Sequence, residues 1–117
     1  MLISVIVLLV AYVVIAVVVL GCASGRIAPN QIAGIRTPTI TATERTWLVG
    51  HQAARVPTLI GVAAGAACAV VVFFVDAEQT KSLLTGVSVA VMLVGLLVGA
   101  AAGTKAARTV LAESDLH

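Results

Sequence analysis

The sequence predicts an all-α membrane protein with three transmembrane helices and a short interfacial helix in the first loop. The chain has 117 residues, of which 61% are hydrophobic, 7 are Lys or Arg and 5 are Asp or Glu. Soluble domains are about 45–50% apolar and about 25% charged, because a small soluble domain leaves much of its surface in water. The composition therefore excludes a disordered chain, a secreted disulfide scaffold and an ordinary soluble enzyme, and it indicates lipid as the solvent.

Three stretches of 20 to 25 residues carry no Asp, Glu, Lys or Arg. About 20 apolar residues in a helix cross the roughly 30 Å hydrocarbon layer. Helices are expected because an isolated span must satisfy its own backbone hydrogen bonds. We therefore expect a single domain over residues 1–117, with transmembrane helices at about residues 1–23, 57–75 and 83–103.

The first apolar stretch has two interpretations. It lacks a basic leading region and is too long for a typical signal peptide, so we expect an uncleaved helix. The alternative is that residues 19–22, Val-Leu-Gly-Cys, act as a lipobox, and that the mature chain begins at a lipidated Cys22. Without lipidation, Cys22 and Cys68 are expected to be buried as small hydrophobic residues, because no CxxC or Cys/His spacing is present.

The basic residues predict the orientation of the spans. Six of the seven lie on one side of a three-helix chain, in the first loop or in the tail. The positive-inside rule places that side in the cytoplasm. We therefore expect the N-terminus outside and the C-terminus in the cytoplasm. The six residues are Arg26, Arg36, Arg45, Arg55, Lys105 and Arg108.

Glycines recur four residues apart in the second and third predicted spans. Residues at i and i+4 share a helix face, and glycine there allows another backbone to approach closely. The spacing predicts helix packing, either within one chain or between copies, and it suits a homo-oligomer or a membrane protein partner. The glycines are Gly61, Gly65, Gly95, Gly99 and Gly103.

The cytoplasmic motif loop, residues 24–56, is the main polar segment. Pro38 predicts an extended conformation before it. Thr41 and Glu44 have the spacing of a capping box, which predicts a short helix over residues 42–55 at the membrane surface. Trp47 on this helix favours the membrane–water boundary, and Pro57 then suits the first turn of the second span.

Catalytic, metal and cofactor sites are not expected. Glu44 and His51 supply two ligands at most, whereas zinc requires three or four, so we expect a surface histidine. No nucleotide-binding motif or nucleic-acid surface is present, and no charge lies deep in a span, which argues against an ion pathway. The hydroxyl of Tyr12 should meet a carbonyl or a neighbouring helix. The loop arginines either bind anionic lipid or phosphate, or serve only as topology signals.

The motif loop resembles the SdpI family of bacterial membrane proteins. The resemblance is carried by the Pro-Asn pair at residues 29–30, the run Gly-Ile-Arg-Thr-Pro at residues 34–38, Thr41, the acidic Glu44 and the Trp-x-x-x-His spacing at residues 47–51. By motif it covers about residues 21–59, and by hydropathy alone it covers the rest of the three-helix module. The founding member of the family has additional spans before this module. The family motif residues here are Asn30, Gly34, Arg36, Thr37, Pro38, Glu44, Trp47 and His51.

The resemblance implies a multi-pass protein of the bacterial inner membrane. The founding member confers immunity against a secreted toxin and signals by sequestering a repressor at the membrane. By this resemblance we expect a small non-catalytic protein that acts in immunity or signalling by binding a partner at its motif loop. The alternative is an accessory structural subunit of a larger membrane complex.

Overall fold

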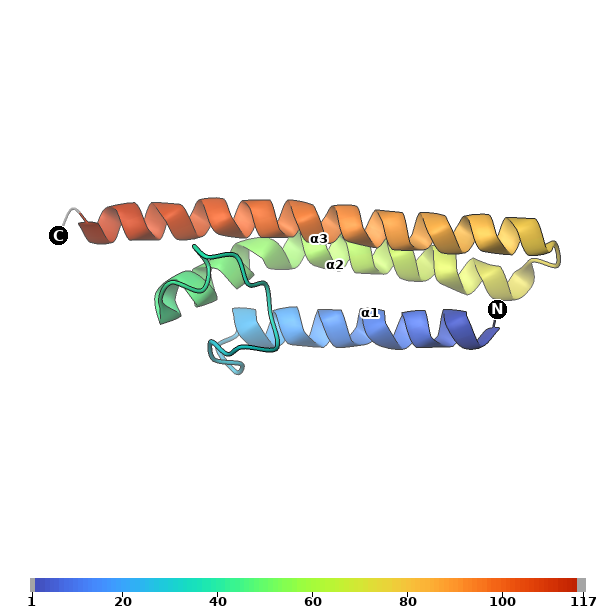
Figure 1. Ribbon diagram of the computed structural model, residues 1–117, viewed down its shortest axis with the longest axis horizontal. Helices are drawn as coiled ribbons and strands as arrows, with labels where there is room; N and C mark the ends of the chain where they lie inside the picture. Colours follow the sequence, from blue (N-terminus) through green and yellow to red (C-terminus); the bar gives the residue numbers. More distant parts are fainter. Residues whose placement is uncertain (1, 116–117) are drawn as a thin grey trace.

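The protein is a bundle of three long helices, as Figure 1 shows for a computed structural model. We describe the backbone of residues 2–115 and the side chains of residues 2–113. The prediction of an all-helical protein with three helices long and apolar enough to span a membrane is confirmed. The elements are α1 (Leu2–Ala23), α2 (Glu44–Val71), the 3-10 helix η1 (Val72–Phe74) and α3 (Glu78–Asp115).

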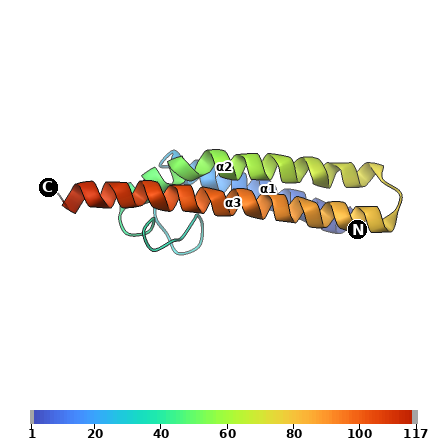
Figure 2. The same cartoon turned by 90° about the horizontal axis from the view of Figure 1, so that it is seen from above.

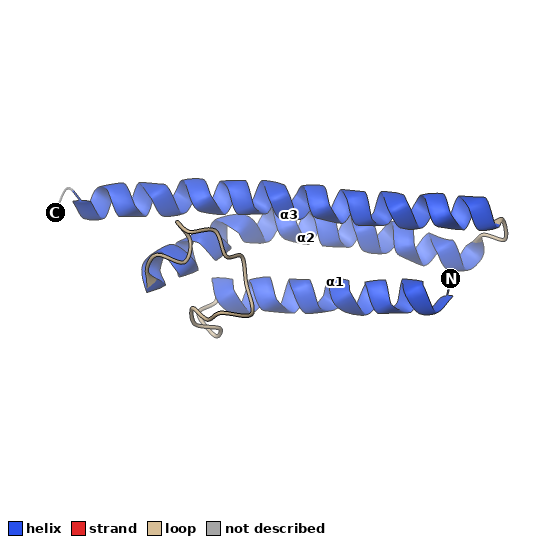
Figure 3. Cartoon of the chain, viewed as in Figure 1, coloured by secondary structure: helices blue, strands red, loops and turns tan. Residues whose placement is uncertain are grey.

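The helices lie lengthwise beside one another in a rod of 61 × 21 × 18 Å (Figures 1 and 2). The 22 residues of α1 give a length of about 33 Å at 1.5 Å per residue, which matches the hydrocarbon layer of roughly 30 Å. The 38 residues of α3 reach about 57 Å. Helix α3 therefore continues beyond the spans, at the end where the loop of residues 24–43 lies (Figure 3).

The outer faces of the helices are apolar. Ile3, Ile60 and Leu97 are 79%, 64% and 67% exposed, and many other large hydrophobic side chains resemble them. A soluble protein rarely exposes so continuous an apolar surface, whereas hydrocarbon chains solvate it without cost. The exposed residues therefore mark the surface that faces lipid.

Small residues bring α2 and α3 into backbone contact. A Cβ atom added to Gly61 would lie 2.8 Å from the Cα atom of Gly95, and one on Gly65 would lie 3.0 Å from the carbonyl oxygen of Ser88. Farther along, Gly99 lies against Thr58, and a Cβ on Gly103 would lie 2.5 Å from the Gly50 carbonyl oxygen. The glycine faces therefore meet within one chain.

A series of hydrogen bonds inside the bundle joins all three helices. The Ser88 hydroxyl donates to the Gly65 carbonyl at 2.6 Å, so the Tyr12 hydroxyl, 2.8 Å from Ser88 Oγ, donates to Ser88. Tyr12 is buried and packs with Val62 and Met92. The hydroxyl of Tyr12 thus meets a neighbouring helix, and its ring fixes α1 against the α2–α3 pair.

Two helix boundaries differ from the prediction. Helix α2 begins at Glu44 and runs through Pro57 without a break, so a separate interfacial helix is not present in the described residues. Its first turns are inclined to the rest (Figure 1), because Pro57 has no N–H to donate to the carbonyl four residues earlier. Helix α3 extends beyond residues 83–103. Hydropathy marks the part of a helix that lies in lipid, not where the helix ends.

The capping box also lies two residues later than predicted. Thr43 is the N-cap: its hydroxyl accepts from the Thr46 N–H at 3.0 Å, and the Thr46 hydroxyl accepts from the Thr43 N–H at 2.8 Å. The Thr46 hydroxyl donates in turn to the Ile40 carbonyl at 3.0 Å. This buried threonine satisfies two loop groups at once, whereas the predicted partner Glu44 is exposed. Thr41 instead donates to the Thr37 carbonyl.

Candidate functional site

The loop of residues 24–43 folds back over one end of the bundle and contacts all three helices. Gly25, with φ at +82°, turns the chain away from α1. The Gln52 side-chain amide on α2 donates to the Ala23 carbonyl at 3.2 Å, which ties the end of α1 to α2. The loop is therefore held at its start by an adjacent helix.

Asn30 shapes the first half of the loop. Its side-chain oxygen accepts from the N–H groups of Ile32 at 2.9 Å and Ala33 at 2.7 Å. Its side-chain NH₂ donates to the Ala28 carbonyl at 2.9 Å. Asparagine commonly organises a turn in this way, by bonding backbone groups close to it in sequence. The side chain therefore holds the loop and is not displayed to a ligand.

Gly34 lies where the loop crosses the side chains of α2. Its φ is +110°, in a region that glycine adopts readily and that residues with a Cβ atom avoid. A Cβ atom there would lie 2.6 Å from the Trp47 ring and 3.0 Å from His51 Nε2. Backbone geometry and space therefore both require glycine.

Trp47 is buried beneath the loop, with 2% of its surface exposed. Its indole N–H donates to the Ile27 carbonyl at 3.0 Å, and its ring centroid lies 4.4 Å from that of His51. Trp47 therefore anchors the loop from within the protein. Its location at the membrane–water boundary stays a prediction.

His51 is fully buried, so the expectation of a surface histidine is wrong. Its Nε2 accepts from the Ile35 N–H at 2.8 Å, so its Nδ1 carries the proton and donates to the Trp47 carbonyl at 2.7 Å. This pattern defines the neutral Nδ1–H tautomer. Both ring nitrogens are occupied, and His51 joins the loop to α2. The error arose because a loop that returns to cover a helix face leaves no local sequence signal.

Thr37 joins the loop to α3. Its hydroxyl lies 2.9 Å from that of Thr104, and its carbonyl accepts from the Thr41 N–H at 3.0 Å. Residues 35–37 lack regular structure, as Pro38 predicts, and a turn follows. Sequence reasoning missed Thr104, because a threonine at the end of an apolar span gives no signal of its own.

Ile40 and Gly50 were also missed. Ile40 is fully buried, and a Cβ atom on Gly50 would lie 2.8 Å from its side chain. Ile40 belongs to a buried cluster that also contains Cys22, Ile35 and Trp47. The sequence feature that could have identified Ile40 as buried is its position as an apolar residue inside a polar loop.

The family motif residues therefore separate into two sets. Asn30, Gly34, Thr37, Trp47 and His51 hold the loop in place, whereas Arg36, Pro38 and Glu44 are exposed. Arg36 and Glu44 form no hydrogen bond or ion pair with the residues that the structure describes. Arg36 is therefore exposed between two residues that hydrogen bonds hold in place. Ile35 is bonded to His51, and Thr37 is bonded to Thr104.

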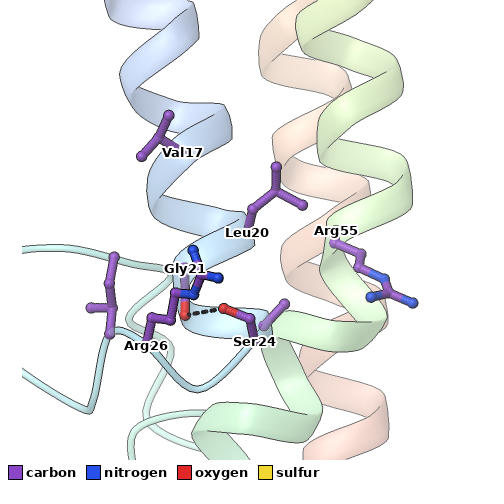
Figure 4. Close-up of a pocket in the computed structure, with 8 residues that line it drawn as sticks. Val17, Leu20, Gly21, Ser24, Arg26 and Arg55 are labelled. Atoms are coloured by element: carbon purple, nitrogen blue, oxygen red, sulfur yellow. Dashed lines mark hydrogen bonds between the residues drawn. The ribbon is translucent and has the colours of Figure 1, made fainter.

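A cleft of about 490 Å³ lies where α1 meets the loop (Figure 4). Arg26 from the loop and Arg55 from α2 both line it, with Leu20 of α1 between them in the view. The Ser24 hydroxyl, also in its wall, donates to the Gly21 carbonyl at 3.1 Å. The cleft thus has apolar and cationic parts, which suits an amphiphilic anion.

Among the described residues, no group of three or more His, Cys, Asp or Glu side chains could hold a metal ion. Cys22 and Cys68 are free thiols, with Cys22 buried and Cys68 half-buried. The site therefore consists of a buried hydrogen-bonded scaffold, displayed arginines and the cleft.

Comparison with protein families gives one match: residues 26–104 match the SdpI/YfhL protein family. The matched part contains the loop from Arg26 onward, all of α2 and most of α3. It covers well over half of the chain, and it confirms the family expected from the motif. Searches of curated proteins and of solved structures gave no significant match.

Proposed function

The chain belongs to the SdpI/YfhL protein family, and from this premise we propose that it acts by binding a protein partner at its motif loop. The partner interaction serves toxin immunity or membrane signalling. The loop faces the cytoplasm of a bacterial cell, with the N-terminus on the other side of the inner membrane.

The exposure of the Arg36 side chain on a loop that is held in place supports this proposal. Hydrogen bonds hold the residues on both sides of it, through the Ile35 N–H and the Thr37 side chain, while its guanidinium is exposed and unpaired within the described residues. A partner that binds a preorganised arginine does not have to order the loop first, and binding is stronger for that reason. Arginine also suits bidentate contact with a carboxylate. We therefore expect the partner to present an acidic side chain to Arg36.

The proposal assigns no catalytic step. His51 uses both ring nitrogens in fixed hydrogen bonds, so it has no free lone pair to accept a proton. Glu44 is exposed at the first turn of α2 and has no partner among the described residues. A binding role needs only the shape and charge of the loop, which these contacts supply.

The test is to purify the tagged protein from its own membrane in mild detergent and to measure the stoichiometry of every co-purified protein. Arg36→Ala should lose the partner, with recovery lower by about tenfold. Arg108→Ala is the matched control, since it removes an exposed arginine from α3 near the same end. Both variants should express and unfold like the parent chain. Equal partner recovery with Arg36→Ala would refute the proposal.

A subunit role in a larger membrane complex is the second candidate. A groove of about 430 Å³ on α2 and α3 supports it, because its lining is apolar, from Val56 and Ile60 to Val94 and Val98. Such a groove suits the side chains of another transmembrane helix. A large partner recovered in fixed stoichiometry, and retained with Arg36→Ala, would favour this role.

A further inference from the structure

We propose that the cleft between α1 and the loop binds the phosphate headgroup of an anionic phospholipid through Arg26 and Arg55. The acyl chain of that lipid follows the outer face of α1. The proposal stands apart from partner binding, because Arg36 does not line this cleft.

The two arginines bring positive charge to a cleft that no acidic side chain lines. Both are exposed, and neither forms a hydrogen bond or ion pair with a described residue. No Asp or Glu lines the cleft. Arg26 and Arg55 come from different elements, on either side of Leu20 in Figure 4. Arginine bonds phosphate with charge assistance and in a bidentate manner, so each arginine of the cleft wall can donate to an anion bound in the cleft.

The backbone of α1 does not compete for these guanidinium groups. A helix usually ends in carbonyls without partners, which attract cations. Here the Leu20 carbonyl accepts from the Ser24 N–H at 3.0 Å, and the Gly21 carbonyl accepts from the Ile27 N–H at 3.0 Å. The Ala23 carbonyl accepts from Gln52. With these acceptors occupied, the arginines remain available to an external anion.

The apolar wall favours a lipid over a free phosphate ion. Val17 and Leu20 line the cleft and are 60% and 46% exposed. They belong to the lipid-facing surface of α1. Arg26 and Arg55 lie at the loop end of that surface (Figure 4). Basic residues next to a span attract anionic headgroups. A phospholipid satisfies both parts of the cleft, whereas inorganic phosphate satisfies only the arginines.

Native mass spectrometry of the detergent-purified chain tests this assignment. The protein is titrated with phosphatidylglycerol, and bound lipid is counted for two double variants that remove the same charge. Arg26→Gln with Arg55→Gln should bind about tenfold more weakly than Arg36→Gln with Arg45→Gln, whose side chains lie outside the cleft. The parent chain should bind zwitterionic phosphatidylcholine more weakly than phosphatidylglycerol.

Three outcomes would overturn the assignment. Equal binding by the two double variants would show a diffuse charge effect. Equal binding of the two lipids by the parent chain would show no preference for an anion. Displacement of phosphatidylglycerol by an equal concentration of inorganic phosphate would make the ligand a free phosphate.

Emission of Trp47 reports the fold of the loop, since its indole bonds Ile27 in the cleft wall. If the cleft double variant changes that emission, the single variants Arg26→Gln and Arg55→Gln replace it. Each should then bind about threefold more weakly than the matched single variant Arg45→Gln. Equal binding by the single variants would also contradict the proposal.

Discussion

At the scale of the residue, Gly34 and His51 form one contact that determines where the loop lies. Gly34 allows the chain to pass close to the Trp47 ring, and the next N–H, that of Ile35, reaches His51 Nε2. His51 thereby satisfies a buried backbone donor that has no helix or sheet partner. The motif spacing from Gly34 to His51 thus has a structural cause: the glycine and the histidine must meet across two elements.

Gly34→Ala should therefore destabilise the protein by about 2–4 kcal/mol, because it adds the cost of a positive φ to that of overpacking against Trp47. Thermal unfolding in detergent, followed by the emission of Trp47, measures this effect. Gly86→Ala is the control, since a Cβ atom there meets nothing within 4 Å, and it should be neutral or slightly stabilising. Similar stability of the two variants would show that the loop does not need glycine at residue 34.

At the scale of the element, the contact between α2 and α3 depends on glycine and on one unusual threonine. Gly95 and Gly99 bring the backbones together, and the Thr58 side chain lies against Gly99. The Thr58 hydroxyl is buried and has no hydrogen-bond partner among the described residues. A buried hydroxyl without a partner lowers stability, so Thr58 reduces the stability of the contact between α2 and α3.

Thr58→Val should therefore be neutral or stabilise the protein by about 1 kcal/mol, because it removes an unpaired polar atom and keeps the shape of the side chain. Thr104→Val is the matched change on α3. It breaks the bond to Thr37 and should cost about 1 kcal/mol. Thermal unfolding of both variants in one detergent gives the comparison. A larger loss for Thr58→Val than for Thr104→Val would show that the Thr58 hydroxyl has a partner in the membrane.

At the scale of the whole molecule, charge separates the two ends of the rod. The loop, the first turns of α2 and the end of α3 carry six of the seven basic residues. The ion pair of Lys81 with Glu78, at 3.3 Å, lies at the other end. An asymmetry of this kind sets the orientation of short-looped membrane proteins.

The expected orientation can be tested with reporter fusions. A fluorescent protein fused to the C-terminus should fluoresce in the cytoplasm, and alkaline phosphatase at the same site should be inactive, because basic flanks are retained inside. Alkaline phosphatase inserted after Asp76, in the turn before α3, should be active and serves as the positive control. An active phosphatase at the C-terminus would contradict the topology and move the motif loop outside the cell.

Much of the fold could be predicted because the relevant signals are local. An uncharged stretch of sufficient length indicates a span whatever it packs against, and glycines four apart identify a packing face. The helix boundaries were predicted less well. The extension of α3 past Gly103 is stabilised by the burial of Ala107 and Val110, and hydropathy does not register such contacts.

The sequence by itself determined the membrane as solvent, the three helices, the glycine faces and the family motif. The tertiary structure decided which motif residues are buried and which are displayed: His51 and Trp47 lie inside, and Arg36 lies outside. It also brought Arg26 and Arg55 to one cleft. The physical reason is that these outcomes depend on contacts between residues far apart in the chain, such as Thr37 with Thr104 and Ile35 with His51. Local composition and spacing carry no record of such pairs.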